Sequence, residues 1–310
     1  MSDNPIHIIV NPHSGYGGQK LQLAELCNEL RLAGRQTVEY VTKSAGDATR
    51  RAREISSEAS VVVAWGGDGT INEVANGLGG SSVPLMIVRG GTENLLAKEL
   101  GIPRRVAAQA QIILAGRTMD FDIGLINGQS FHSILGVGFD AEVVRRLSSG
   151  RSGHISHLSY FWPIWRTFWE HDFPNLHVTA DGEEIFHVKG LAFVGNISRY
   201  SAGLRICRHA KFDDGLLDLV VFKCSERTGL VLHAAWTMLR VHPLKGNVIY
   251  RPAKKIRIES PDDIPCELDG DLGPSTPLDI SIAPYKIKLL VPEQQSRWTL
   301  PLWPWKGAPL

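Results

Sequence analysis

The chain has 310 residues, of which 43% are hydrophobic and 21% charged, a length and composition typical of a globular protein with two domains. Its formal net charge of +1 excludes a global basic field that would attract nucleic acid or an anionic membrane, so any membrane contact must be local. The sequence has neither the features of a signal peptide nor a run of about 18 apolar residues, and we expect a cytoplasmic protein with peripheral membrane association.

Short apolar runs alternate with amphipathic segments over the first 120 residues. The apolar runs predict strands at 6–10, 36–42, 60–65 and 84–89. The segments between and after them predict helices at 19–32, 47–55, 71–78, 94–100 and 106–115. Strands that alternate with helices form parallel sheets covered on both faces, so residues 1–120 are predicted to form a three-layer α/β domain.

Strand-like runs separated by Gly, Asn and Asp follow after about residue 120. Their spacing predicts an antiparallel β-sandwich over residues 121–291, with strands at 121–126, 130–137, 177–180, 186–194, 217–222, 255–259, 278–282 and 287–291. Two helical insertions are expected, near 154–170 and near 226–242. The tail, residues 292–310, is rich in Trp and is expected to return to the first domain or to mark a subunit contact.

A glycine-rich turn follows the predicted strand 60–65 and opens an amphipathic helix. It consists of Gly66, Gly67, Asp68, Gly69 and Thr70. Adjacent glycines let a ligand approach the backbone closely, and a helix N-terminus favours phosphate. In this turn Asp68 can hold Mg²⁺ on the phosphates, and Thr70 can donate its hydroxyl or cap the helix. A plain structural turn is the alternative, because the segment is neither a Walker A loop nor a dinucleotide fingerprint.

Two further polar turns follow the first and fourth predicted strands. Asn11–Gly15 comes after the first strand, and Gly90–Asn94 comes after the fourth. Ligands of open α/β sheets bind beyond the carboxyl ends of the strands, so the three turns should converge on one cleft. Such a convergence favours a ligand site over three unrelated turns.

These turns and several later motifs resemble the catalytic domain of the diacylglycerol kinase family, which includes sphingosine kinases and bacterial lipid kinases. NAD kinases and phosphofructokinases are more distantly similar. The matching motifs run in family order across nearly the whole chain: Asn11-Pro12 with Ser14-Gly15, Gly66–Thr70 with Asn72-Glu73, Gly91-Thr92 with Asn94, Asp120 and Asp122, Gly136–Asp140, Asp213–Gly215, and Asp269-Gly270.

The resemblance implies an α/β nucleotide-binding domain and a β-sandwich substrate domain, with the active site in the cleft between them. It makes Asp269 the general base that takes the proton of the lipid hydroxyl. A hairpin turn is the alternative for Asp269-Gly270. The residues implied for ATP are Asn11, Ser14, Gly66, Gly67, Asp68, Gly69, Thr70, Glu73, Thr92 and Asn94.

Two magnesium sites are expected. The candidates for a phosphate-linked Mg²⁺ are Asp68, Asp122 and Asp271. The resemblance adds a structural Mg²⁺ away from the phosphates, held by Asp214 and the backbone carbonyls of Lys211 and Leu216. The 11 histidines show no metal-binding motif such as H-E-x-x-H, and no metal site is expected from them.

Two residues depart from the family pattern. Leu95 stands where an Asp often follows the Asn of the G-T-x-N turn. Asp271 replaces the Glu of the usual D-G-E, and its carboxylate is shorter by one methylene. Both changes remove or shorten an acidic contact. The alternative that follows from them is a nucleotide- or lipid-binding module with impaired catalysis.

An aromatic and basic segment, 154–170, is the candidate for membrane contact. It contains Trp162, Trp165 and Trp169, and Arg166 lies among them. Amphipathic rings suit the membrane interface, and basic residues suit anionic headgroups. An aromatic helix packed on the sandwich core is the alternative. Trp298, Trp303 and Trp305 pose the same choice, or mark a contact in a homodimer.

The leading hypothesis is an ATP- and Mg²⁺-dependent lipid kinase that phosphorylates diacylglycerol or a similar lipid at a membrane surface. A kinase of a soluble acceptor, closer to NAD kinase, is the second hypothesis. An apolar cleft beside Asp269 favours a lipid, whereas a polar cleft favours a dinucleotide. No nucleic-acid partner is expected.

Overall fold

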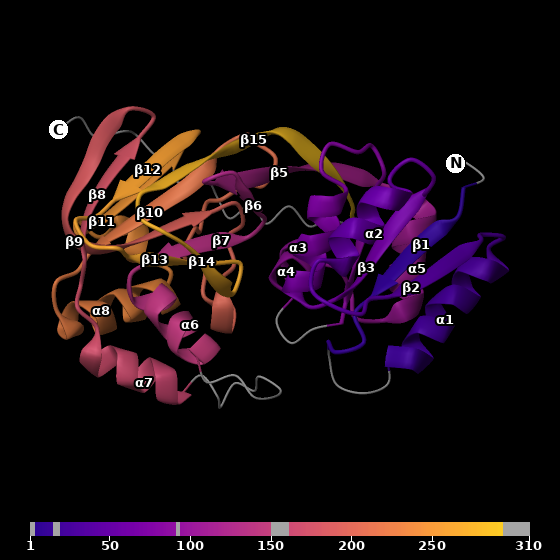
Figure 1. Ribbon diagram of the computed structural model, residues 1–310, viewed down its shortest axis with the longest axis horizontal. Helices are drawn as coiled ribbons and strands as arrows, with labels where there is room; N and C mark the ends of the chain where they lie inside the picture. The colour runs from indigo at the N-terminus through magenta and orange to yellow at the C-terminus, as the bar shows by residue number, and fades with distance from the viewer. Residues whose placement is uncertain (1–3, 15–18, 91–93, 150–160, 294–310) are drawn as a thin grey trace.

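The computed structural model describes residues 4–14, 19–90, 94–149 and 161–293 and shows two lobes side by side (Figure 1). The first lobe is an α/β sandwich and the second is a β-sandwich with helices along one side. This arrangement confirms the predicted fold class. The predicted tail, residues 292–310, lies almost entirely outside the described residues.

A parallel sheet forms the centre of the first lobe. Its strands are β1 (Ile6–Val10), β2 (Thr37–Val41), β3 (Val61–Gly66) and β4 (Leu85–Arg89), in the spatial order β2-β1-β3-β4. Every residue of β1 and β3 is buried, since helices cover both faces of the sheet. This burial explains why these strands are continuous apolar runs without alternation.

Five helices surround this sheet, at nearly the predicted positions. They are α1 (Gln19–Leu32), α2 (Asp47–Ile55), α3 (Asp68–Gly77), α4 (Leu95–Glu99) and α5 (Val106–Ala115). Their apolar faces join the strands in one core, in which Trp65, Ile71 and Leu85 are almost completely buried. The short loops after β1, β3 and β4 therefore emerge at the same edge of the sheet.

Two long strands belong to both lobes. β5 (Thr118–Ile126) and β15 (Leu278–Leu290) pair antiparallel, and Leu289 of β15 also pairs in parallel with Leu85 of β4. The register shifts between Ile282 and Lys286, and the pairing then resumes. The segments expected as two strands, 278–282 and 287–291, are therefore one interrupted strand. The predicted boundary at residue 120 falls inside β5.

The second lobe stacks two antiparallel layers. One layer follows the order β9-β8-β12-β15-β5-β6, and the other follows β14-β13-β7-β9-β10-β11, so the long strand β9 serves both. The strands are β6 (Gln129–Phe131), β7 (Ile134–Val137), β8 (Asn175–Ala180), β9 (Glu183–Gly195), β10 (Leu217–Lys223), β11 (Val248–Ala253), β12 (Lys255–Glu259), β13 (Pro265–Leu268) and β14 (Asp271–Ser275). Val178, Val194 and Ile256 lie in the core between the layers.

Among the described residues of the second lobe, three helices lie along one side (Figure 1). They are α6 (Phe139–Ser149), α7 (Phe161–Glu170) and α8 (Arg227–Met238). Helices were expected near 154–170 and 226–242, but α6 was not, because the strand-like run before it concealed its helical pattern. Across the described ranges, none of the helices combines the length and apolarity needed to cross a bilayer.

Candidate functional site

Hydrogen bonds join the turn after β1 to the glycine-rich turn after β3. Asn11 Nδ2 donates to Thr70 Oγ1 at 3.0 Å, and the backbone N–H of Asn11 donates to the carbonyl of Trp65 at 2.9 Å. Ser14 Oγ donates to the Asn11 carbonyl at 2.9 Å, which closes the first turn. Asn11, Ser14 and Thr70, all predicted for the nucleotide, therefore lie together.

The turn after β4 is joined to the same glycine-rich segment. Asn94 Nδ2 donates to the Gly66 carbonyl at 2.9 Å. The Asp68 carboxylate accepts the backbone N–H groups of Asn94 at 2.9 Å and Leu95 at 2.7 Å, so it caps the N-terminus of α4. The described residues of the three predicted turns thus form one hydrogen-bonded group at the sheet edge. Thr92 lies outside the described residues.

The glycines of this turn have different surroundings. A Cβ on Gly66 would lie 2.4 Å from the Cβ of Thr70, so only glycine fits there without a shift. A Cβ on Gly69 would meet nothing within 4 Å, because that position in the first turn of α3 faces open space. Gly67 precedes α3 with an extended backbone. The open N-terminal turn of α3 is therefore the part of the lobe best suited to phosphate.

Glu73 points toward α2. Its carboxylate accepts the backbone N–H of Ala48 at 3.1 Å, and its carbonyl accepts the Thr49 hydroxyl at 2.9 Å. These bonds satisfy the first turn of α2 and fix it against α3. A direct role of Glu73 in nucleotide binding stays a prediction.

Asp269 lies in the turn between β13 and β14, facing the first lobe. Its backbone is left-handed, with φ 52°, which the tight turn requires. Its Oδ1 accepts the N–H groups of Ser133 at 2.8 Å and Ile134 at 3.1 Å. Its Oδ2 accepts the N–H of His132 at 2.8 Å and Asn72 Nδ2 at 2.9 Å. Asn72 belongs to α3, so this bond connects the second lobe to the glycine-rich turn.

Asn72 and His132 are site residues that the predicted set left out. Asn72 stood inside the matched motif, so a signal for it existed. His132 carried no signal, because it lies inside the run 130–137 that was expected as one strand. The structure divides this run into β6 and β7, and the buried His132 ring between them lies 3.8 Å from Asp269 through Nδ1. Only the folded chain brings this histidine and the carboxylate together.

A pair of acids, the buried Glu267 and the partly buried Asp140, lies beside the Asp269 turn. Glu267 accepts the backbone N–H of Gly270, and Asp140 accepts the hydroxyl of Tyr200. Burial, together with the neighbouring Asp140 carboxyl, holds the pKa of Glu267 well above its ordinary value. Burial also raises the pKa of Asp140. The two acids are therefore stable in the fold when at least one of them is protonated.

Asp122 lies with the residues predicted for the structural magnesium. It is fully buried, and its Oδ2 accepts the N–H of Gly215 at 2.7 Å. Its Oδ1 pairs with Lys286 Nζ at 2.8 Å, and Lys286 also donates to the Asp213 carbonyl at 3.2 Å. The contacts tie Asp122 to the loop at 212–216, while its predicted role at the phosphate-linked Mg²⁺ stays a prediction.

The loop at 211–216 offers oxygen donors beside Asp122. Asp214 Oδ1 accepts the N–H of Leu216 at 3.1 Å, so this carboxylate is already oriented by its own loop. Burial raises the pKa of Asp214, and the neighbouring Asp122 and Asp213 raise it further. A cation would relieve this repulsion, so the donor set, which includes the carbonyls of Lys211 and Leu216, suits Mg²⁺. Asp271 begins β14 and is exposed.

The first lobe is a parallel α/β domain with linked polar turns at its strand ends. Shared strands join it to a β-sandwich that supplies a carboxylate. Together these features define a two-lobed kinase fold. A family model described as the diacylglycerol kinase catalytic domain matches residues 5–126. A second, described as the YegS C-terminal NAD kinase beta sandwich-like domain, matches residues 133–291. The chain therefore belongs to the diacylglycerol kinase catalytic-domain family, and it is a phosphotransferase with an alcohol group as acceptor.

Individual relatives match over nearly the whole chain. A diacylglycerol kinase of Bacillus subtilis (strain 168) is 28% identical over 93% of this chain and 97% of its own length. A diacylglycerol kinase of Staphylococcus aureus (strain bovine RF122 / ET3-1) is 29% identical over 87% of each chain. A crystal structure of a diacylglycerol kinase from Bacillus anthracis str. Sterne is 27% identical, with a TM-score of 0.75, over 94% of this chain and 98% of that one.

Proposed function

We propose that this chain transfers the γ-phosphate of ATP to the hydroxyl of diacylglycerol or a closely similar lipid. The single observation that carries the proposal is the hydrogen-bond path from Asn11 through Thr70 and α3 to Asn72 and Asp269. This path links the turns suited to phosphate with a carboxylate from the other lobe. Phosphoryl transfer depends mainly on such positioning and on charge neutralisation.

On the nucleotide side, the open first turn of α3 receives the phosphates. Gly67 and Gly69 allow close approach, and the helix N-terminus supplies partial positive charge. Asn11 orients Thr70, while Asp68 and Asn94 hold the neighbouring turn in place. Thr92, with the rest of its turn, is proposed to complete the site.

On the acceptor side, Asp269 takes the proton of the lipid hydroxyl. A carboxylate has about four lone-pair sites, and in this structure four donors occupy them. Three of those donors are backbone N–H groups, whereas Asn72 is a side chain on α3. We propose that a small movement of Asn72 with α3 frees one oxygen of Asp269 for the hydroxyl.

The oxygen donors of the two predicted magnesium sites fit a hard cation. Asp68 caps α4 through two backbone N–H groups, and its carboxylate oxygens are of the kind that Mg²⁺ prefers. Asp271 lies beside the Asp269 turn and is proposed as a second acidic group there. Mg²⁺, when bound, would neutralise charge on the transferred phosphate. Near Asp122, Lys286 already supplies one positive charge, so a cation held by Asp214 there has a structural role.

The lipid is proposed to reach the site from a membrane that contacts α7 and α8. Trp165 and Trp169 on α7 are about half exposed, at 48% and 52%. Arg227 of α8 donates to the Phe168 carbonyl at 3.1 Å and lies over the ring of Trp169, which ties the two helices together. Aromatic and aliphatic side chains at one surface suit the membrane interface. The exposed aliphatic residues nearby are Ile164, Val231, Leu232, Met238, Leu239 and Leu244.

The reaction is tested by ATP-dependent ³²P transfer in mixed micelles to diacylglycerol, monoacylglycerol, a sphingoid base and ceramide, with NAD as the soluble acceptor. We expect transfer to diacylglycerol that requires Mg²⁺. Transfer to NAD instead would establish the soluble-acceptor alternative. ATP binding without transfer to any acceptor would establish an impaired binding module.

The membrane surface is tested by sedimentation with phosphatidylglycerol vesicles. The double variant Trp165→Ala/Trp169→Ala should bind vesicles more weakly than the parent chain. The matched control is Leu21→Ala/Leu32→Ala, which removes two exposed apolar side chains from α1 of the first lobe. Equal loss in both variants, or no loss in the tryptophan variant, would remove α7 from membrane contact.

A further inference from the structure

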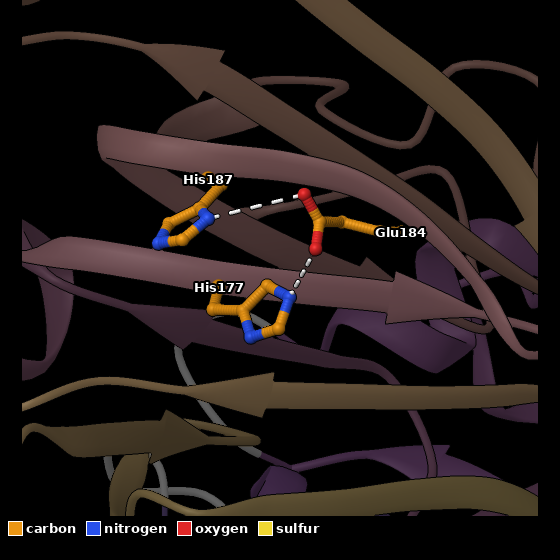
Figure 2. Close-up of side chains that lie close together, drawn as sticks. All are labelled: His177, Glu184 and His187. Carbon is orange, nitrogen blue, oxygen red and sulfur yellow. Dashed lines mark hydrogen bonds and ion pairs between the residues drawn. The ribbon is translucent and has the colours of Figure 1, made fainter.

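A cluster of two histidines and a glutamate lies on strands β8 and β9 of the second lobe (Figure 2). His177 on β8 and His187 on β9 are directly opposite each other in the antiparallel ladder. Their rings are stacked, with centroids 4.8 Å apart. Directly opposite residues on one face of a sheet are held close by the backbone pairing itself, so the two imidazoles are brought together before any ligand binds.

A β-bulge adds Glu184 to this face. Val178 lies opposite Phe186, and Thr179 lies opposite Glu184, which leaves Ile185 as the extra residue. In a regular ladder Ile185 would take the position opposite Thr179, on the same face as the histidines. The bulge turns Ile185 toward the core and puts Glu184 outside in its place. The carboxylate thereby lies 2.8 Å from His177 Nε2 and 3.9 Å from His187 Nδ1.

A third strand extends the row. Glu259 of β12 pairs with His177 from the other side, and its Oε2 lies 3.7 Å from His177 Nδ1. Its second oxygen accepts Arg257 at 2.9 Å. Glu259, His177 and His187 therefore form a line across three neighbouring strands, and the Glu184 carboxylate bridges the two histidines.

We propose that His177, Glu184 and His187 bind Zn²⁺. One ligand atom from each residue lies within 4.8 Å of the other two. Tetrahedral zinc with bonds of about 2.0–2.2 Å holds its ligand atoms about 3.3–3.6 Å apart. One oxygen of Glu184 now lies 2.8 Å from His177 Nε2 and the other lies 3.9 Å from His187 Nδ1, so a small rotation of the Glu184 side chain would bring one oxygen to that spacing. Two imidazole nitrogens with one carboxylate suit zinc, whereas Mg²⁺ prefers oxygen ligands alone. Water, or Glu259 after a side-chain rotation, takes the fourth position.

The proposed zinc site lies apart from the candidate site of phosphoryl transfer. β8 and the start of β9 form the side of the second lobe farthest from the first lobe (Figure 1). A zinc ion there would tie neighbouring strands of the hairpin together and stabilise it, since only the folded register assembles the ligands. The ligands are well exposed, His187 at 69%, so we expect zinc that exchanges readily with the solvent.

Zinc binding is tested by calorimetric titration of Zn²⁺ into the chelator-treated full-length chain at neutral pH. We expect one Zn²⁺ per chain and a rise in Tm on binding. Glu184→Gln, and separately His187→Gln, should weaken affinity by about tenfold or more and abolish the rise in Tm. Glu183→Gln is the matched control, because the neighbouring Glu183 pairs with Arg251 instead. Its zinc affinity should equal that of the parent chain.

Two outcomes would overturn the assignment. One is the absence of stoichiometric Zn²⁺ binding by the parent chain. The other is unchanged stoichiometric binding in the double variant His177→Gln/His187→Gln, which would place the ion elsewhere. Circular dichroism of each variant, recorded without metal, verifies that a lost titration does not come from a lost fold.

Discussion

At Asp269, four hydrogen bonds hold the carboxylate in place before any substrate arrives. Three of the donors belong to consecutive residues, His132, Ser133 and Ile134, at the start of β7. The position of this group is therefore fixed mainly within its own lobe. Asn72 alone among the four donors comes from the first lobe, so it is the contact through which α3 influences the carboxylate.

Asp269→Asn should lower turnover by about 10² or more and leave ATP affinity nearly unchanged, as the loss of a general base does. The amide nitrogen would also face backbone donors, so a lower Tm is expected. Steady-state kinetics and calorimetric ATP titration measure both effects. The control is Asp279→Asn, an exposed carboxylate paired with Arg257. Unchanged turnover in Asp269→Asn would remove this residue from the mechanism.

Glu267→Gln should make stability less dependent on pH. The pKa of Glu267 is raised in the folded chain, so its stabilising contribution is complete below the ordinary pKa of about 4.3 and is lost as pH rises through the raised value. Glutamine retains an acceptor for Gly270 and never ionises. Between pH 5 and 9, the Tm of the variant should therefore fall less than that of the parent chain.

The control for this titration is Glu58→Gln, an exposed carboxylate in the first lobe. Its Tm should follow the parent curve. If the Tm of Glu267→Gln falls with pH as steeply as that of the parent chain, the pair of Glu267 and Asp140 does not titrate between pH 5 and 9.

Residues that stand in motifs, such as Asn11, Asp68 and Asp269, could be predicted from the sequence. Partners that only tertiary pairing supplies could not. Lys286 lies far along the chain from Asp122, yet it neutralises that buried carboxylate at 2.8 Å. No local pattern encodes such a pair, because each side chain alone is typical of a polar surface.

Among the structural elements, the turn from β3 into α3 offers a test that separates stability from binding. Gly66→Ala should destabilise the chain by roughly 1–3 kcal/mol, since its Cβ would lie 2.4 Å from Thr70. Gly69→Ala should leave Tm equal or higher, because alanine is favoured within a helix by about 0.5–1 kcal/mol. The same methyl should nevertheless weaken ATP binding, as it occupies the open space at the helix start.

Thermal unfolding and ATP titration of both variants give the two readouts. Gly69→Ala with normal ATP affinity would move the phosphates away from the first turn of α3. Gly66→Ala with an unchanged Tm would mean that Thr70 can move aside without cost.

The α/β elements were predictable because short continuous apolar runs alternate with amphipathic segments, with clear turn signals between them. The antiparallel elements were less so. The sequence predicted a strand over 177–180 and another over 186–194, but not the bulge at Ile185 that shifts Glu184 to the outer face. Register depends on pairing between strands, so a pattern within one strand does not encode it.

At the scale of the whole molecule, β5 and β15 make the lobes one structural unit. Gly124→Ala in β5 would bring a Cβ to 2.3 Å from the buried ring of Phe131, with an expected cost of roughly 1–3 kcal/mol. Because β5 pairs with β15, which also pairs with β4, the substitution should lower the stability of both lobes. Hydrogen exchange should therefore accelerate together in β3 and β10.

Gly246→Ala is the control, since a Cβ there meets nothing within 4 Å. If hydrogen exchange in the Gly124→Ala variant accelerates in β10 but not in β3, the lobes open independently.

The interruption of β15 between Ile282 and Lys286 determines how the enzyme can admit its acceptor. Two domains joined only by a flexible linker could separate widely and close around a substrate. Here the backbone ladder of β5 and β15 runs from one lobe to the other on both sides of that interruption, and wide separation of the lobes would break its hydrogen bonds. The interruption is the point at which the ladder can flex without breaking. Opening should therefore be a shallow bend at the interruption, and the acceptor would enter between two lobes that stay joined by their shared strands.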